Sequence, residues 1–309
     1  MVQHTRAPHT RLLTPLLAAG TALAMLALAG CEAPAPDGGA EAEPAMETAA
    51  AAPGVVEITS TGMNFQLPSE IPSGWTTFRY DNQADVTHFF VLERMPEGRT
   101  VEDSRTEVVP VFQEAMDLIV AGEPEAGFAA FDSLPAWFFE VGFVGGAGLT
   151  APGATAQTTV ELEPGTYVIE CYVKAPGGTF HSSLGMIAGL TVTGDSTGAE
   201  EPTADVMVTL SNAGIALAGE PAAGSQTFGV RFQEQMAHEH FLGHDVHLVR
   251  MDEGTDPEAV AAWMNWAAPE GLTTPGPARF LGGAQEMPAG ETAYFTADLT
   301  PGQYALVAE

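Results

Sequence analysis

Two segments of this chain hold residue types that bind transition metals. In the first, Cys171 is followed by His181 and Met186, and His88 lies upstream of them. A thiolate, two imidazoles and a thioether are soft donors of the kind that suits copper. The second segment is rich in histidine, a composition that would suit copper or zinc. Its four histidines are His238, His240, His244 and His247.

Each of these residues also has a purely structural explanation. Cys171 would be a small buried hydrophobe, His88 a strand-end histidine bonded to the backbone, and Met186 a packing residue. The histidine-rich segment would be a polar strand and turn whose histidines face water or the neighbouring domain. The sequence leaves these explanations open. Because the donors of the first segment occur together, we favour a metal site there.

The surrounding sequence predicts strands and helices that would position these donors. Period-2 alternation of apolar residues predicts strands over residues 56–59, 158–162, 166–171 and 187–193. Helical spacing predicts two helices, over residues 101–121 and 257–267. The 34 glycines and 23 prolines among 309 residues are also typical of a turn-rich β protein.

The chain repeats one unit twice. Landmarks recur in the same order, so the sequence predicts two tandem β-sandwich domains, 55–195 and 204–309, each with a helical insertion, joined by a linker over 196–203. The recurring landmarks are a Gly-x-x-Thr-Phe segment (residues 74–78 and 224–228), a histidine (88 and 244), an Arg-Met-x-Glu-Gly turn (94–98 and 250–254), a Gly-Gly-Ala stretch (145–147 and 282–284) and a Pro-Gly-x-Tyr turn (164–167 and 301–304).

Residues 55–195 resemble a cupredoxin domain, the family of plastocyanin and azurin. The resemblance rests on Asn82-x5-His88, on Pro164-Gly-x-Tyr running to Cys171, and on Gly185-Met186 before the last predicted strand. It implies a Greek-key β-sandwich, and in the second unit a cupredoxin-like sandwich of the same kind.

The resemblance also implies a type-1 copper site for single-electron transfer, with a redox protein as partner. His88, Cys171 and His181 would be the trigonal ligands, and Met186 the weak axial one. His181 would be the exposed ligand, with Phe180 in an apolar docking rim. The loop from Cys171 to His181 is longer than the family's usual loop, so a metal-free binding or structural module remains an alternative. Copper storage, delivery or sensing is another.

The second domain differs from the first at its end. The counterpart of Cys171 there is Ala308, which excludes a thiolate-bound site. The sequence stops at Glu309, before the counterparts of the ligand loop and the last strand. A missing strand leaves an open sheet edge, which a partner strand would cover. The alternative, which we favour, is that the sequence is a truncated copy of a longer chain.

The first 54 residues look like an export signal and a tether. A basic start, the apolar residues 12–28 and Leu28-Ala-Gly-Cys31 resemble a bacterial lipobox, which implies a lipid anchor on Cys31 after removal of residues 1–30. An ordinary secretory signal is the alternative. Residues 31–54 predict a disordered tether. We therefore expect an extracytoplasmic protein of the bacterial cell envelope, anchored to a membrane.

Charge and missing motifs exclude several functions. With 40 acidic and 10 basic residues the formal charge is −30, which disfavours nucleic acid as a partner. We find no nucleophile elbow, phosphate-binding loop or dinucleotide fingerprint, and predict that the protein is not an enzyme. The sequence gives no oligomeric state.

Overall fold

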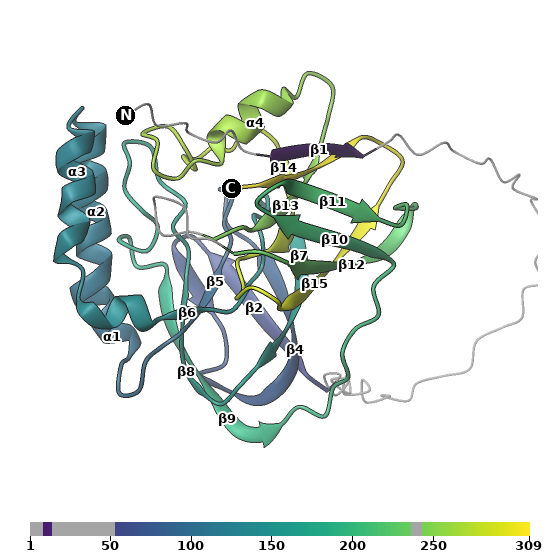
Figure 1. Cartoon of the computed structure of the whole chain (residues 1–309), viewed down its shortest axis with the longest axis horizontal. Helices are drawn as coiled ribbons and strands as arrows, with labels where there is room; N and C mark the ends of the chain where they lie inside the picture. Colours follow the sequence, from purple (N-terminus) through teal and green to yellow (C-terminus); the bar gives the residue numbers. More distant parts are fainter. Residues whose placement is uncertain (1–8, 14–52, 236–242) are drawn as a thin grey trace, which may run out of the picture.

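The first domain packs two sheets face to face. The computed structural model describes residues 9–13, 53–235 and 243–309 (Figure 1). In one sheet β2 pairs with β3 and with β4, and β4 pairs with β7. The other sheet has the strand order β9, β8, β5, β6. Residues 70–73 of β4 also pair with β9, so this strand belongs to both sheets. The strands are β2 (Val55–Thr61), β3 (Asn64–Gln66), β4 (Glu70–Asn82), β5 (Val91–Arg94), β6 (Gly142–Phe143), β7 (Thr155–Leu162), β8 (Gly165–Glu170) and β9 (Ile187–Ser196).

The second domain repeats this plan, so the all-β class and the two sandwiches are confirmed. One of its sheets has the order β11, β10, β12, β15, and the other β1, β16, β13, β14. In the first domain β9 pairs with β8. In the uncleaved chain β1, which comes from the predicted signal segment, pairs with β16 in the same way and covers the edge expected to be open. The strands are β1 (His9–Leu13), β10 (Val206–Ser211), β11 (Gly214–Ala218), β12 (Gly224–Phe232), β13 (Val246–Arg250), β14 (Arg279–Ala284), β15 (Thr292–Leu299) and β16 (Tyr304–Ala308).

Helices form where the sequence predicts both insertions. The first insertion runs through α1 (Val101–Asp103), a π-helical turn (Ser104–Val108), α2 (Val109–Val120), α3 (Pro124–Ala130) and two 3-10 turns (Phe131–Ser133, Ala136–Glu140). Figure 1 shows α2 and α3 side by side at one end of the molecule. The second insertion forms α4 (Pro257–Trp263), four residues shorter than predicted. None of the helices in the described part of the chain has the length and hydropathy to cross a bilayer.

The two domains join along a pseudo-twofold axis. Strand β7 pairs with β15 antiparallel, with Thr158 opposite Phe295, its own counterpart in the repeat. Ala147 likewise forms a bridge with its counterpart Ala284. The Gly-Gly-Ala stretches therefore contact each other. A Cβ on Gly146 would overlap the carbonyl oxygen of Phe90, which explains the glycine there.

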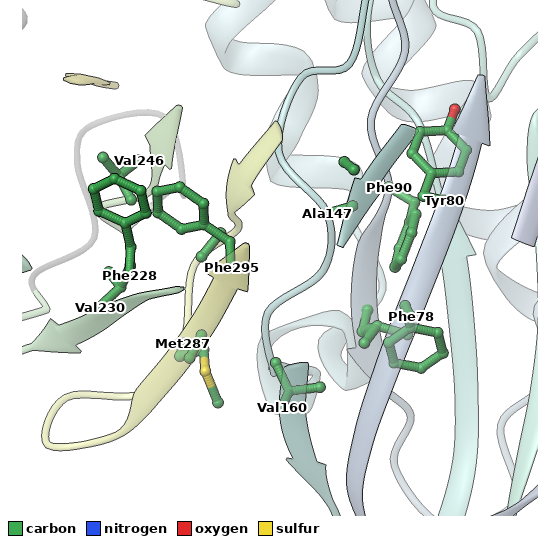
Figure 2. Close-up of a cluster of buried hydrophobic side chains, with 14 of the residues drawn as sticks. Phe78, Tyr80, Phe90, Ala147, Val160, Phe228, Val230, Val246, Met287 and Phe295 are labelled. Atoms are coloured by element: carbon green, nitrogen blue, oxygen red, sulfur yellow. The ribbon is translucent and has the colours of Figure 1, made fainter. Parts of the chain in front are cut away.

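One apolar core runs through both domains (Figure 2). Phe78 and Phe90 pack edge to face in the first domain, with ring centroids 5.6 Å apart. Phe228 and Phe295 stack in the second, at 4.7 Å. Met287 belongs to the same cluster. Because core and sheet are shared, the loops of the second domain are held in a fixed position against the first.

Candidate metal centre

The backbone after β8 brings three of the predicted ligands together. Cys171 directly follows the strand, and its N–H donates to the carbonyl of Met186 at 3.2 Å. The Met186 N–H donates to the carbonyl of His181 at 2.9 Å, and the His181 N–H to that of Val173 at 2.8 Å. The chain therefore returns to Cys171 despite the long loop.

The additional length of the loop forms a hairpin over residues 174–180. Lys174 and Phe180 form an antiparallel bridge, and the Ala175 N–H donates to the Thr179 carbonyl at 2.8 Å. The turn contains Gly177 and Gly178, whose φ angles of 95° and 92° favour glycine. The hairpin begins after Cys171 and ends before His181, and the His181 N–H bonds to the Val173 carbonyl, so the loop length does not separate the two ligand positions.

His88 reaches the same point from the connection between β4 and β5. It forms a bridge with Thr150, and Asn82 fixes both segments, since its amide donates to the carbonyls of Val86 at 2.9 Å and Thr150 at 2.8 Å. The Ser60 hydroxyl donates to Asn82 Oδ1 at 2.9 Å. Asn82 therefore positions the segment that carries His88, which gives the Asn-x5-His spacing a physical reason.

The donor atoms of His88, Cys171 and His181 face one another. The two Nδ1 atoms are 3.0 Å apart, and Cys171 Sγ lies 3.8 Å from that of His88 and 3.7 Å from that of His181. All three side chains are 0% exposed. Within the described residues, this is the one group of three or more histidine, cysteine or acidic side chains with metal-ligand spacing.

These distances fit a trigonal metal ion. Bonds of about 2.0 Å to nitrogen and about 2.3 Å to sulfur, at 120°, place sulfur and nitrogen about 3.7 Å apart. Both sulfur–nitrogen distances match this value. The nitrogen–nitrogen distance is about half an ångström shorter than two bonds of about 2.0 Å at 120° would give. The donor set and its spacing therefore suit a mononuclear copper site.

Burial sets the protonation of the donors. It lowers the pKa of His88 to about 4, and burial together with the neighbouring His88 lowers that of His181 to about 3. Both rings are therefore neutral near pH 7 and keep a lone pair for a metal. Burial raises the pKa of the Cys171 thiol to about 12, so metal binding must release its proton.

The prediction of an exposed His181 and an exposed Phe180 is wrong. Both side chains are buried, because α2 and the second domain cover the ligand loop. Gln113 on α2 accepts from the Phe180 N–H at 2.9 Å, and Trp266 of the second domain lies 6.0 Å from the Phe180 ring. Leu184, three residues after His181, is instead 47% exposed.

Lys174 anchors the ligand loop to the second domain. The side chain of this lysine, the single one in the chain, is fully buried. Its Nζ donates to the carbonyls of Trp266 at 2.7 Å and Ala268 at 2.6 Å, and its backbone N–H donates to Leu272 at 2.7 Å. Sequence reasoning missed this role, and the one available signal was the isolation of a lysine within the ligand loop.

The described histidines of the second segment bond to protein groups. His247 Nδ1 accepts from the Leu149 N–H at 2.9 Å, and its Nε2 lies 2.7 Å from Asp245 Oδ2. His244 Nε2 lies 3.0 Å from Asn212 Oδ1. His247 therefore links the two domains by hydrogen bonds. The predicted positions His238, His240 and Cys31 lie outside the described residues.

Comparison with known proteins finds blue copper proteins among similar folds. Reduced auracyanin from Roseiflexus castenholzii is 26% identical over 45% of this chain and 97% of its own, with a TM-score of 0.28. Auracyanin A of Chloroflexus aurantiacus, a "blue" copper protein, is 25% identical over 45% of this chain and 98% of its own, with a TM-score of 0.28. A Cu-containing nitrite reductase from Thermus scotoductus is 11% identical over 80% of this chain and 55% of its own, with a TM-score of 0.22.

No family model and no curated protein matches the chain. These low TM-scores carry no argument about the function of this chain. The similar structures include an enzyme as well as blue copper proteins. That this protein is not an enzyme stays a prediction.

Proposed function

We propose that the chain binds one copper ion at His88, Cys171 and His181, and that it transfers single electrons. The observation that carries the proposal is the mutual spacing of the three donor atoms, 3.0 to 3.8 Å, in a fully buried site. Copper held by a thiolate and two imidazoles supplies a one-electron couple. Met186, whose backbone bonds to both Cys171 and His181, is proposed as the weak axial donor.

The protein around the donors would keep their positions fixed in both oxidation states. Asn82 holds the His88 segment, and Lys174 holds the ligand loop against the second domain. Burial excludes water from the donors. A site that does not rearrange loses little energy on gaining or losing an electron.

Because the His181 side chain is buried, a redox partner would dock at a neighbouring exposed residue. His181 is buried, whereas Leu184 is exposed and its N–H donates to the His181 carbonyl at 3.0 Å. We place the partner contact at Leu184 rather than at the imidazole itself. The lipobox resemblance at Cys31 supports a proposed location outside the cytoplasm, where a lipid on that residue would anchor the protein to the membrane.

The test is a copper titration of the full chain. We expect a strong thiolate-to-copper absorption band in the visible that saturates at one equivalent of copper(II). The variant Cys171→Ser should lose the band, and Cys31→Ser, the matched cysteine control, should keep it. A chain that binds no copper, or a band that survives in Cys171→Ser, would overturn the proposal. Several equivalents of bound copper that depend on His238 and His240 would favour copper handling instead.

A further inference from the structure

A pocket of about 310 Å³ lies where segments of the two domains meet. The first domain contributes residues 85–87 and 151–152, and the second domain contributes four residues between 275 and 279. Nothing proposed above for the metal centre uses this pocket. Its lining carries one acidic and one basic side chain, Asp85 from the first domain and Arg279 from the second.

Three segments that lie side by side determine the width of the pocket. His88 forms an antiparallel bridge with Thr150, and Thr150 forms another with Leu281. Paired strands lie about 4.8 Å apart, so the two outer segments are about 10 Å apart. One outer segment carries Asp85 and the other carries Arg279. The two charged side chains therefore belong to opposite sides of the pocket.

Asp85 and Arg279 do not bond to each other. Among the described residues, no ion pair and no hydrogen bond is found for either side chain. Arg250, which is opposite Arg279 in the β13–β14 register, does have an acidic partner, since its Nε lies 3.0 Å from Asp252 Oδ1. The pocket therefore separates a carboxylate from a guanidinium, and each has room for a partner of opposite charge.

Thr87 adds a hydroxyl group to the side that carries Asp85. The Thr87 side chain is 4% exposed and lines the pocket, and within the described part of the chain its hydroxyl has no hydrogen-bond partner. A hydroxyl buried to this degree normally has one, so a polar group of a ligand is expected beside it. The rest of the lining is small and aliphatic, with Val86, Pro152 and Pro275 as its larger side chains.

Charge and size then select the ligand. A simple anion would be repelled by Asp85 and a simple cation by Arg279, whereas a molecule with both charges pairs with both side chains. Because the long arginine side chain covers much of the separation, the two charges of the ligand must lie close together. A cavity of roughly 150 Å³ holds a benzene ring, so this pocket has room for a small organic molecule.

We propose that the pocket binds a free α-amino acid with an aliphatic side chain. Its carboxylate accepts from the Arg279 guanidinium, which suits a planar carboxylate. Its ammonium group donates to the Asp85 carboxylate and to the Thr87 hydroxyl, which lies two residues further along the chain and lines the same pocket. Its side chain packs on the prolines of the lining. The proposal goes beyond the metal centre and does not depend on it.

The test is calorimetric titration of the metal-free full chain with L-valine. Two analogues each lack one charged group of valine: isobutylamine keeps the ammonium, and 3-methylbutanoate keeps the carboxylate. At equal ionic strength we expect one bound valine per chain and at least about tenfold weaker binding of each analogue. Absence of valine binding would overturn the proposal. Equal binding of isobutylamine would show a plain attraction of cations to an acidic protein, equal binding of 3-methylbutanoate a plain anion site, and either would also overturn it.

Variants of the charged side chains locate the binding. Asp85→Asn should weaken valine binding about tenfold or more, to the level of 3-methylbutanoate, and Arg279→Gln should weaken it to the level of isobutylamine. Thr87→Val keeps the shape but removes the hydroxyl, and should weaken binding several-fold. Asp298→Asn on β15 and Arg79→Gln on β4 remove exposed charges elsewhere, and should bind like the parent. Unchanged affinity in both charge variants of the pocket, each checked for its thermal transition, would overturn the proposal independently of any copper result.

Discussion

Glu286 makes the stability of this protein depend on pH. The side chain follows β14, is 4% exposed, and accepts from the Gly243 N–H at 2.6 Å through Oε2. Its Oε1 has no hydrogen-bond partner in the described part of the chain. Burial, with a smaller effect from nearby Asp245, raises the pKa of Glu286 from 4.5 to about 8. Between these two pKa values the Glu286 carboxyl group is therefore protonated in the folded state and ionised in the unfolded state.

The sign and size of the effect follow from this pKa. The stabilising contribution is complete below 4.5, the ordinary pKa, and is lost as pH rises through the folded pKa of about 8. At about 1.4 kcal/mol for each pKa unit, the full loss is about 5 kcal/mol. A typical domain is stable by only about 5–15 kcal/mol, so the loss is a large fraction of the total.

The perturbation is Glu286→Gln, a neutral side chain of the same shape. Guanidinium unfolding of parent and variant is measured at about pH 5 and about pH 8. We expect the free energy of unfolding of the variant, relative to the parent, to rise by about 3–4 kcal/mol between these values. Glu170, whose pKa burial raises to about 7, still titrates in both proteins and cancels. If the variant has the same pH dependence as the parent, Glu286 is solvated and the reasoning fails. The exposed Glu161→Gln should have the parent's pH dependence.

Three further substitutions test the packing of the domains, each by denaturant unfolding. Lys174→Met leaves the carbonyls that accept from Nζ without a partner inside the protein, and should cost about 2–4 kcal/mol. Gly146→Ala places a methyl against the Phe90 carbonyl at a φ of 135°, and should cost more than about 3 kcal/mol. His247→Ala leaves the buried Leu149 N–H unpaired, and should cost about 1–3 kcal/mol. A loss under about 0.5 kcal/mol, typical of surface sites, would contradict the contact concerned.

The sequence predicts the features that local pattern and repetition encode. Strand alternation and the repeated landmarks are local, so the strands and helices that the sequence predicts are found close to the predicted positions. His88, Cys171 and His181 were selected by residue type and order, and the structure brings their donor atoms within reach of one ion. Their role as copper ligands stays a proposal.

Contacts between distant segments could not be predicted in this way. His181 is buried because α2 and Trp266 cover its loop, and neither contact leaves a signal in the sequence around His181. Lys174 would be expected at the surface, since a lysine is rarely buried. The pairing of β7 with β15 depends on which strand edges meet, and alternation along one strand does not encode its neighbour.

The pairing of counterparts across the pseudo-twofold axis also bears on how the protein unfolds. Since β7 and β15 lie inside one sheet and one core, neither sandwich can lose its structure without breaking the strand ladder and apolar contacts of the other. The free energies of unfolding of the two domains are therefore coupled. A partly unfolded state with one intact sandwich is high in free energy. Heat or denaturant should unfold the two sandwiches in one cooperative step. A substitution that destabilises either domain should therefore also make the segment around Cys171 unfold more readily.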